Sequence, residues 1–109
     1  MHENIIIVEG KHDKERLASL IKRDTLVLCT YGIPTHEHLM QLKNAIGDAK
    51  VYVFTDQDQA GRRIRGILTE EIPDAIHLHT KAEYGGVEKT PIVYLMHILE
   101  RYELLSEIS

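Results

Sequence analysis

The sequence predicts an α/β protein in which helices alternate with the strands of a mainly parallel sheet. Short apolar runs rich in β-branched residues recur along the chain, for example at residues 5–8 and 51–55, and such runs are typical of buried strands. Between the runs, apolar residues return every three or four positions, as in amphipathic helices. Alternation of this kind favours right-handed βαβ units. We therefore expect a four-stranded sheet with helices on both faces, in three α/β/α layers.

Length and composition fit one compact unit. The chain has 109 residues, of which 43% are hydrophobic, so we expect a single domain over residues 1–109. No apolar stretch approaches the ~20 residues that cross a bilayer, and residues 1–4 lack the basic start of a signal peptide. We expect a cytoplasmic protein without membrane contact. The net charge of −4 argues against non-specific coating of nucleic acid, which needs many cationic contacts to phosphate.

The first half of the chain predicts two strands and a helix between them. After the strand at residues 5–8, Asp13 is placed to cap a helix that runs to about Lys22. The second strand covers residues 26–29 and ends in Cys29, the single cysteine of the sequence. A lone free cysteine in an apolar run is usually packed in the core, so we expect burial rather than nucleophilic chemistry.

The middle of the chain predicts a loop and a second helix. Glycine and proline mark residues 30–34 as the loop. Thr35 is then placed to cap a helix that continues through roughly Ala45, and Gly47 stands where a helix stop belongs.

The second half predicts two helices around a short strand. A helix should follow Asp58 and end before Pro73, because proline blocks its continuation. A fourth strand is expected at residues 75–79, followed by a loop with paired glycines. Thr90 precedes a proline, a pattern that predicts the start of a last helix reaching about Leu104. The apolar residues expected to pack this helix into the core are Ile92, Leu95, Met96 and Leu99.

Acidic residues follow two of the predicted strands. Glu9 comes after the first strand, and Asp56 and Asp58 come after the third. Chemistry in α/β sheets gathers at the carboxyl ends of strands, so we expect these carboxylates to meet, which requires the first and third strands to be neighbours. Carboxylates so close repel one another unless a hard cation such as Mg²⁺ binds. The alternative is that all three are surface caps at strand-to-helix turns.

Four segments taken together carry a family resemblance. They are the strand at residues 5–8, the Glu-Gly-Lys-x-Asp sequence at 9–13, Gly32, and the strand ending in Asp-x-Asp at 53–61. In this order they resemble the Toprim domain over nearly the whole chain, and residues 54–65 and 86–88 look closest to the small bacterial ribosomal-RNA maturation nucleases and the primase-like branch. The resemblance implies a Rossmann-like fold and Mg²⁺-dependent phosphodiester chemistry on nucleic acid, by a nuclease or a nucleotidyl- or phosphoryl-transfer enzyme.

The resemblance also implies roles for individual residues. Glu9 would be the acid–base residue and also lie at the metal, while Asp56 and Asp58 would hold Mg²⁺, for which Mn²⁺ can substitute. Glu88 would be a further metal ligand, although a loop acid of this kind is as often only solvated. Lys11 is the remaining candidate for the catalytic set, because its ammonium group can neutralise a phosphate oxygen.

Several neighbouring residues are candidates for binding phosphate. Gly10 and Gly32 would let backbone amides approach it, although plain turn requirements explain these glycines equally well. Asp13 is either a helix cap or an outer partner of the metal site, and one role does not exclude the other. Arg62 and Arg63 open the helix after Asp58, where guanidinium groups can pair with a nucleic-acid backbone.

Three points stay open from the sequence. For Arg63 and Arg65, a solvated helix face is as good an interpretation as a nucleic-acid contact. The histidine pairs do not predict zinc. His36 and His38 start a predicted helix, where a two-residue spacing does not put both rings on one face, and His77 and His79 have no evident third ligand. Finally, the same acidic edge would also suit a non-catalytic module that binds a nucleotide or an RNA or DNA end. In either case we expect help from a homodimer or a partner protein.

Overall fold

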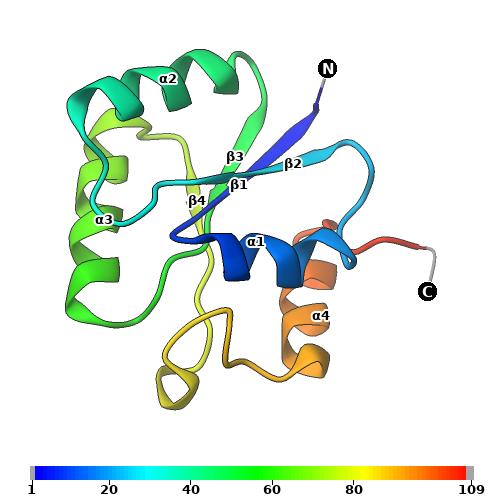
Figure 1. Ribbon diagram of the computed structural model, residues 1–109. Coiled ribbons are helices and arrows are strands. Elements are labelled where there is room, and N and C mark those ends of the chain that lie inside the picture. Colours follow the sequence, from blue (N-terminus) through cyan, green and yellow to red (C-terminus); the bar gives the residue numbers. More distant parts are fainter. Residues whose placement is uncertain (1, 108–109) are drawn as a thin grey trace.

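The computed structural model of the protein describes residues 2–107, and their arrangement is shown in Figure 1. Strands and helices alternate along these residues as predicted. In chain order the elements are β1 (Asn4–Val8), α1 (Lys11–Ala18), β2 (Thr25–Cys29), α2 (His36–Ile46), β3 (Lys50–Val53), α3 (Gln59–Glu71), β4 (Ile76–His77), the 3₁₀ turn η1 (Ala82–Tyr84) and α4 (Ile92–Arg101). Within the same residues, no helix is long and apolar enough to cross a membrane.

The described strands form one parallel sheet in the order β2-β1-β3-β4. On β1, Asn4 pairs with Thr25 of β2 on one side and with Lys50 of β3 on the other. The predicted adjacency of the first and third strands is therefore confirmed. The chain leaves β1 toward β2 and later returns to the other side at β3, so the strand order reverses between β1 and β3. In open α/β sheets, the crevice at such a reversal is where ligands bind.

The two faces of the sheet carry separate hydrophobic clusters. Side chains alternate along a strand, so Ile6 and Val8 of β1 join one cluster while Ile5 and Ile7 join the other. The first cluster includes Leu17 of α1, Leu95 and Leu99 of α4, and the buried Cys29. The second includes Leu39 of α2 and Ile64 and Leu68 of α3. Figure 1 shows the same division, with α1 and α4 on one face and α2 and α3 on the other. The three-layer prediction is confirmed.

The helix α1 begins earlier and ends sooner than the sequence predicts. Gly10 is its N-cap, and Asp13 lies in the first turn, where its Oδ2 accepts a hydrogen bond from the Gly10 amide at 3.1 Å. Asp13 therefore does cap the helix, but from its third residue, as in a capping box. The helix ends at Ala18, and beyond it Ile21 forms an antiparallel bridge with Leu105.

The helices α2 and α3 begin where the sequence predicts. The Thr35 hydroxyl accepts a hydrogen bond from the His38 amide at 3.1 Å, and Gly47 ends α2 with a positive φ of 54°. Asp58 is the N-cap of α3. The fourth strand is shorter than expected, since its ladder covers only Ile76–His77.

The start of α4 differs from the prediction in two ways. The Thr90 hydroxyl does not cap the helix, because it donates to the carbonyl oxygen of Gly86 at 2.5 Å. Ile92 is 44% exposed rather than part of the core, whereas Leu95 and Leu99 are fully buried as expected. The apolar stripe of α4 thus meets the core only after its first turn.

Candidate metal centre

Glu9 lies at the centre of the site because hydrogen bonds tie it to both neighbouring strands. It directly follows β1. Its backbone carbonyl accepts a hydrogen bond from the Tyr31 amide beyond β2 at 2.7 Å. Its carboxylate Oε2 accepts a longer one from the Asp56 amide beyond β3 at 3.4 Å. The side chain is therefore held at the point where the strand order reverses.

Three carboxylates meet around this point. Glu9, Asp13 and Asp56 each offer a carboxylate oxygen, and these atoms lie within 4.8 Å of one another. We call these residues the acidic group. Asp13 comes from α1 and is only 7% exposed, while Asp56 follows β3. The predicted meeting of Glu9 and Asp56 occurs, but Asp13 supplies the third carboxylate of the group. Among the residues that the structure describes, no histidine belongs to such a group.

Asp58 lies at the rim of the site rather than in the acidic group. Its Oδ1 accepts a hydrogen bond from the Gly61 amide at 2.7 Å, as expected of the N-cap of α3. Its side chain is exposed. It nevertheless lines a pocket of about 200 Å³ together with Asp56 and Glu88. Asp58 therefore combines the capping role with a place beside the acidic group.

The acidic group is electrostatically strained. Burial raises the pKa of Glu9 to about 8, and a hydrogen bond and the negative charge of Asp56 push it the same way. Burial also raises the pKa of Asp13, with further contributions from the charges of Asp56 and Glu88. A bound cation would relieve this repulsion. Since the donors are all carboxylate oxygens, they suit a hard ion such as Mg²⁺, Mn²⁺ or Ca²⁺ rather than one that prefers nitrogen or sulfur.

Two glycines make room for Asp56. A Cβ atom on Gly86 would lie 1.8 Å from Asp56 Oδ1, and a Cβ on Gly61 would lie 2.1 Å from the Asp56 backbone oxygen. Real Cβ contacts do not come closer than 3.0 Å. The side chain and the backbone of Asp56 are thus each packed against a position where only glycine fits.

Glu88 is placed at the rim by the backbone of its own loop. Arg16 Nη1 donates to the Glu88 carbonyl at 2.8 Å, and Nη2 donates to the Thr90 carbonyl at 2.6 Å. The Glu88 side chain is exposed, and its charge contributes to the raised pKa of Asp13, which is mainly due to burial. Glu88 is therefore close to the acidic group without belonging to its tight set.

The predicted phosphate-binding residues outside α3 differ in whether their donor groups are free to bind a phosphate. The Gly10 amide already donates to Asp13. Lys11 is exposed, with its Nζ 4.0 Å from a carboxylate oxygen of Glu15, so its ammonium group faces solvent. Gly32 has a φ of +83°, a conformation that requires glycine for the turn after β2.

The arginines of α3 have different surroundings. Arg62 Nη1 donates to the Gln57 carbonyl at 3.0 Å, and Arg63 is exposed. Arg65 is only 8% exposed, and its Nη2 donates to the carbonyls of Thr55 at 2.9 Å and Leu78 at 2.5 Å. Both interpretations of Arg65, as a solvated residue and as a nucleic-acid contact, were wrong. Its guanidinium group instead holds the chain just before Asp56.

Sequence patterns could have indicated some of these features. Arg65 shares helical spacing with Gly61, Leu68 and Ile72, which places it on the apolar stripe of α3. Gly61 also stands three residues after the Asp58 cap. Gly86 had no such signal, because its contact with Asp56 depends on how the loop after β4 folds back over β3.

The Toprim domain family matches residues 4–87, a range that contains the whole acidic group. The chain belongs to the Toprim family. A solved Toprim structure, described as that of a small TOPRIM domain protein from Bacillus stearothermophilus, superposes with a TM-score of 0.88 at 30% identity. The superposition covers 97% of this chain and 91% of the Bacillus stearothermophilus chain. The predicted Toprim fold is therefore confirmed.

Curated relatives align with most of this chain. The uncharacterized protein YusF of Bacillus subtilis is 33% identical over 94% of this chain and 70% of its own length. Ribonuclease M5 of Bacillus anthracis is 36% identical over 87% of this chain, and that of Lactiplantibacillus plantarum is 40% identical over 76%. The chain spans about half or less of the length of these ribonucleases, 51% and 44% respectively.

Proposed function

We propose that this Toprim protein is a Mg²⁺-dependent enzyme that cleaves phosphodiester bonds in nucleic acid. The observation that carries the proposal is the acidic group at the strand-order reversal, where the pKa of Glu9 is raised to about 8. Similarity to proteins named ribonuclease M5 supports a nuclease. A nucleotidyl- or phosphoryl-transfer reaction on nucleic acid would use the same centre.

The carboxylates of the site would have two roles, metal ligation and proton transfer. Asp56 and Asp13 would hold Mg²⁺ beside Glu9, with Asp58 and Glu88 at the rim. Mg²⁺ bound there would polarise a phosphate oxygen and lower the pKa of a bound water. Without metal the pKa of Glu9 is raised, and a cation bound beside it would lower that pKa again, so that Glu9 could accept a proton from a bound water.

Cationic residues around the centre would position the substrate. Lys11 opens α1 with its ammonium group in solvent, so it can pair with a phosphate oxygen. Arg62 and Arg63 follow the Asp58 cap on α3 and are exposed. Guanidinium groups placed this way can hold a nucleic-acid backbone through paired hydrogen bonds.

The test is metal-dependent cleavage of structured RNA and of single-stranded DNA. Glu9→Gln is expected to lower the rate by about 10²- to 10⁴-fold, the range of lost acid–base catalysis, and Asp56→Asn is expected to lower it by weakening Mg²⁺ binding. The matched controls are Glu70→Gln and Asp48→Asn, which change exposed carboxylates elsewhere on the chain and should leave the rate unchanged. Wild-type rates in both site variants would refute the proposal.

A binding module that does not turn over its ligand is the second candidate. The net charge of −4 favours it, because a low cationic content limits the grip on a long nucleic acid. Calorimetry with Mg²⁺ and nucleotides separates the two: heat of binding without cleavage under any divalent metal would favour the module. The single domain, the cytoplasmic location and a homodimer or partner protein stay predictions.

A further inference from the structure

Tyr31 presents an exposed aromatic ring from a backbone position that is hydrogen-bonded to Glu9. Its side chain is 70% exposed, and its φ of +56° is uncommon for a residue other than glycine. The Tyr31 amide donates to the Glu9 carbonyl at 2.7 Å, so the backbone that carries the ring is attached to the residue at the centre of the site. Unusual backbone conformations of this kind gather at functional sites.

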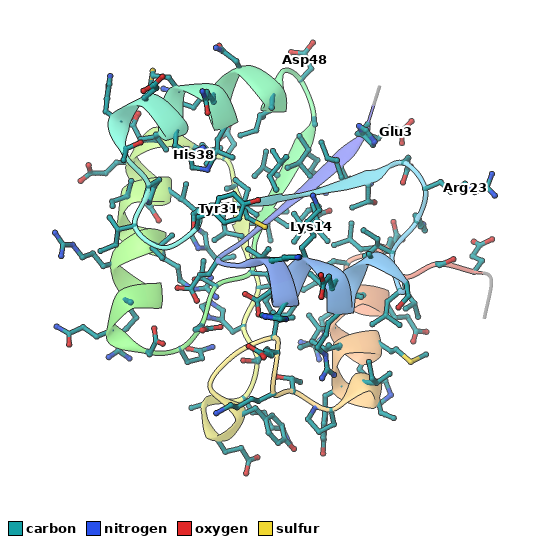
Figure 2. The ribbon with its side chains drawn as sticks, viewed as in Figure 1. Glu3, Lys14, Arg23, Tyr31, His38 and Asp48 are labelled. Carbon is teal, nitrogen blue, oxygen red and sulfur yellow. The ribbon has the colours of Figure 1, made fainter. Side chains whose placement is uncertain are left out.

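A second ring fixes the surroundings of Tyr31. The His38 ring of α2 lies beside it, with a centroid distance of 5.9 Å and a tilt of 40°, and Figure 2 shows the two side chains together. His38 Nε2 is 2.8 Å from the Cys29 carbonyl oxygen. Since a carbonyl only accepts, Nε2 donates, and the ring is held in place. We call Tyr31 and His38 the aromatic pair.

A positive charge acts on Cys29, whose carbonyl oxygen anchors the His38 ring. Burial raises the pKa of the Cys29 thiol, while the charge of Lys14 and a hydrogen bond with Tyr31 oppose the rise. Lys14 of α1 is therefore within electrostatic reach of the Cys29 thiol, and Figure 2 labels it on α1 beside β2. Aromatic faces beside a cation are how proteins bind single-stranded nucleic acid, because bases stack on the rings while cations neutralise phosphates.

We propose that the aromatic pair stacks an unpaired base of a single-stranded nucleic acid whose adjoining phosphate reaches the acidic group. This inference rests on the proposed function and specifies its substrate, a strand that is unpaired at the point of cleavage. The bases of a duplex are covered above and below by their neighbours, so they offer no free face to Tyr31 unless the duplex opens.

A tryptophan probe tests the stacking directly. The chain has no Trp, so Tyr31→Trp introduces a single reporter at the proposed platform. In Ca²⁺, which neutralises the acidic group so that a phosphate can approach, addition of single-stranded RNA or DNA should quench its fluorescence, and an equal duplex should quench it far less. Gel electrophoresis checks that the strands stay intact. The matched control is Asn44→Trp, an exposed position on α2, which should not respond. Absence of quenching at position 31 with both single strands would overturn the proposal.

Affinity measurements separate stacking from mere proximity. Fluorescence anisotropy with a labelled single strand should show a loss of about 5- to 150-fold for Tyr31→Ala, the span of base–aromatic stacking, and less than about 5-fold for Tyr31→Phe. Tyr31→Gly removes the ring and suits the positive φ, so an equal loss there would exclude misfolding as the cause. Unchanged affinity in both truncated variants would overturn the platform.

The two proposals can fail independently. Quenching reports binding and does not depend on turnover, whereas the Glu9→Gln cleavage assay does not depend on Tyr31. Quenching without any cleavage would support the platform and remove the nuclease. Cleavage without quenching would keep the nuclease and overturn the platform. The same result is expected if the aromatic pair binds a protein partner rather than a base.

Discussion

Gly86→Ala should damage the metal centre while leaving the fold largely intact. The added Cβ would lie 1.8 Å from Asp56 Oδ1, where real contacts stay above 3.0 Å, so the carboxylate has to move by at least 1.2 Å. The φ of Gly86 lies outside the left-handed region, so alanine adds no backbone strain there. The atom it meets belongs to a side chain that can rotate. The substitution therefore displaces one carboxylate of the acidic group.

The size of the effect follows from the geometry that Mg²⁺ requires. This ion needs near-ideal octahedral coordination at about 2.0–2.1 Å, so a carboxylate moved by 1.2 Å no longer coordinates it. Residues that support a metal ligand typically contribute 10- to 100-fold in affinity, and we expect a loss of about that size for Mn²⁺ and Mg²⁺ in titration calorimetry. The free energy of unfolding without metal should fall by less than about 2 kcal/mol.

The matched control is Gly66→Ala, because a Cβ on Gly66 meets nothing within 4 Å in the middle of α3. It should leave metal affinity unchanged and raise the free energy of unfolding by about 0.5–1 kcal/mol through helix propensity. Urea unfolding followed by circular dichroism measures this. If Gly86→Ala binds metal as tightly as the unchanged protein, Asp56 is not a ligand and the reasoning about the acidic group is wrong.

Three further predictions concern stability in EDTA, measured by urea unfolding. Gly61→Ala should destabilise by about 1–3 kcal/mol, because its Cβ would meet the Asp56 backbone oxygen, which cannot rotate away; a gain like that of Gly66→Ala would contradict this. The free energy of unfolding should fall by on the order of 1–2 kcal/mol, after allowance for partial exposure, as pH rises from the ordinary Glu9 pKa of 4.5 toward about 8. The reason is that the unfolded chain releases the Glu9 proton at lower pH than the folded chain does. Glu9→Gln should flatten this dependence, and an unchanged slope would mean that Glu9 ionises freely. Arg65→Met should lower the free energy of unfolding by about 2–4 kcal/mol, because it leaves the buried carbonyls of Thr55 and Leu78 without donors. An unchanged free energy of unfolding would show that water replaces the guanidinium group.

Much of the site was predictable because local patterns carry it. The strand before Glu9 and the strand before Asp56 are both read from short β-branched runs, and their parallel pairing follows from the alternation with helices. Their adjacency was predicted from chemistry alone, since carboxylates that share a cation must come from neighbouring strands, and the register of β1 with β3 confirms it. The Thr35 and Asp58 caps were equally local features.

Tertiary structure decided which side chains complete the centre. Asp13 joins Glu9 and Asp56 because α1 starts at Lys11 and turns its first turn toward the sheet edge, whereas sequence spacing favoured Asp58. Gly86 meets Asp56 across a separation of thirty residues.

The sequence by itself determined the strands, the layers and two members of the acidic group, because periodicity, caps and breakers act over a few residues. Only the folded chain decided the burial of Arg65, the exposure of Ile92 and the contact of Gly86 with Asp56. Contacts of this kind depend on how distant segments pack together, and neither propensity nor spacing within one segment specifies them.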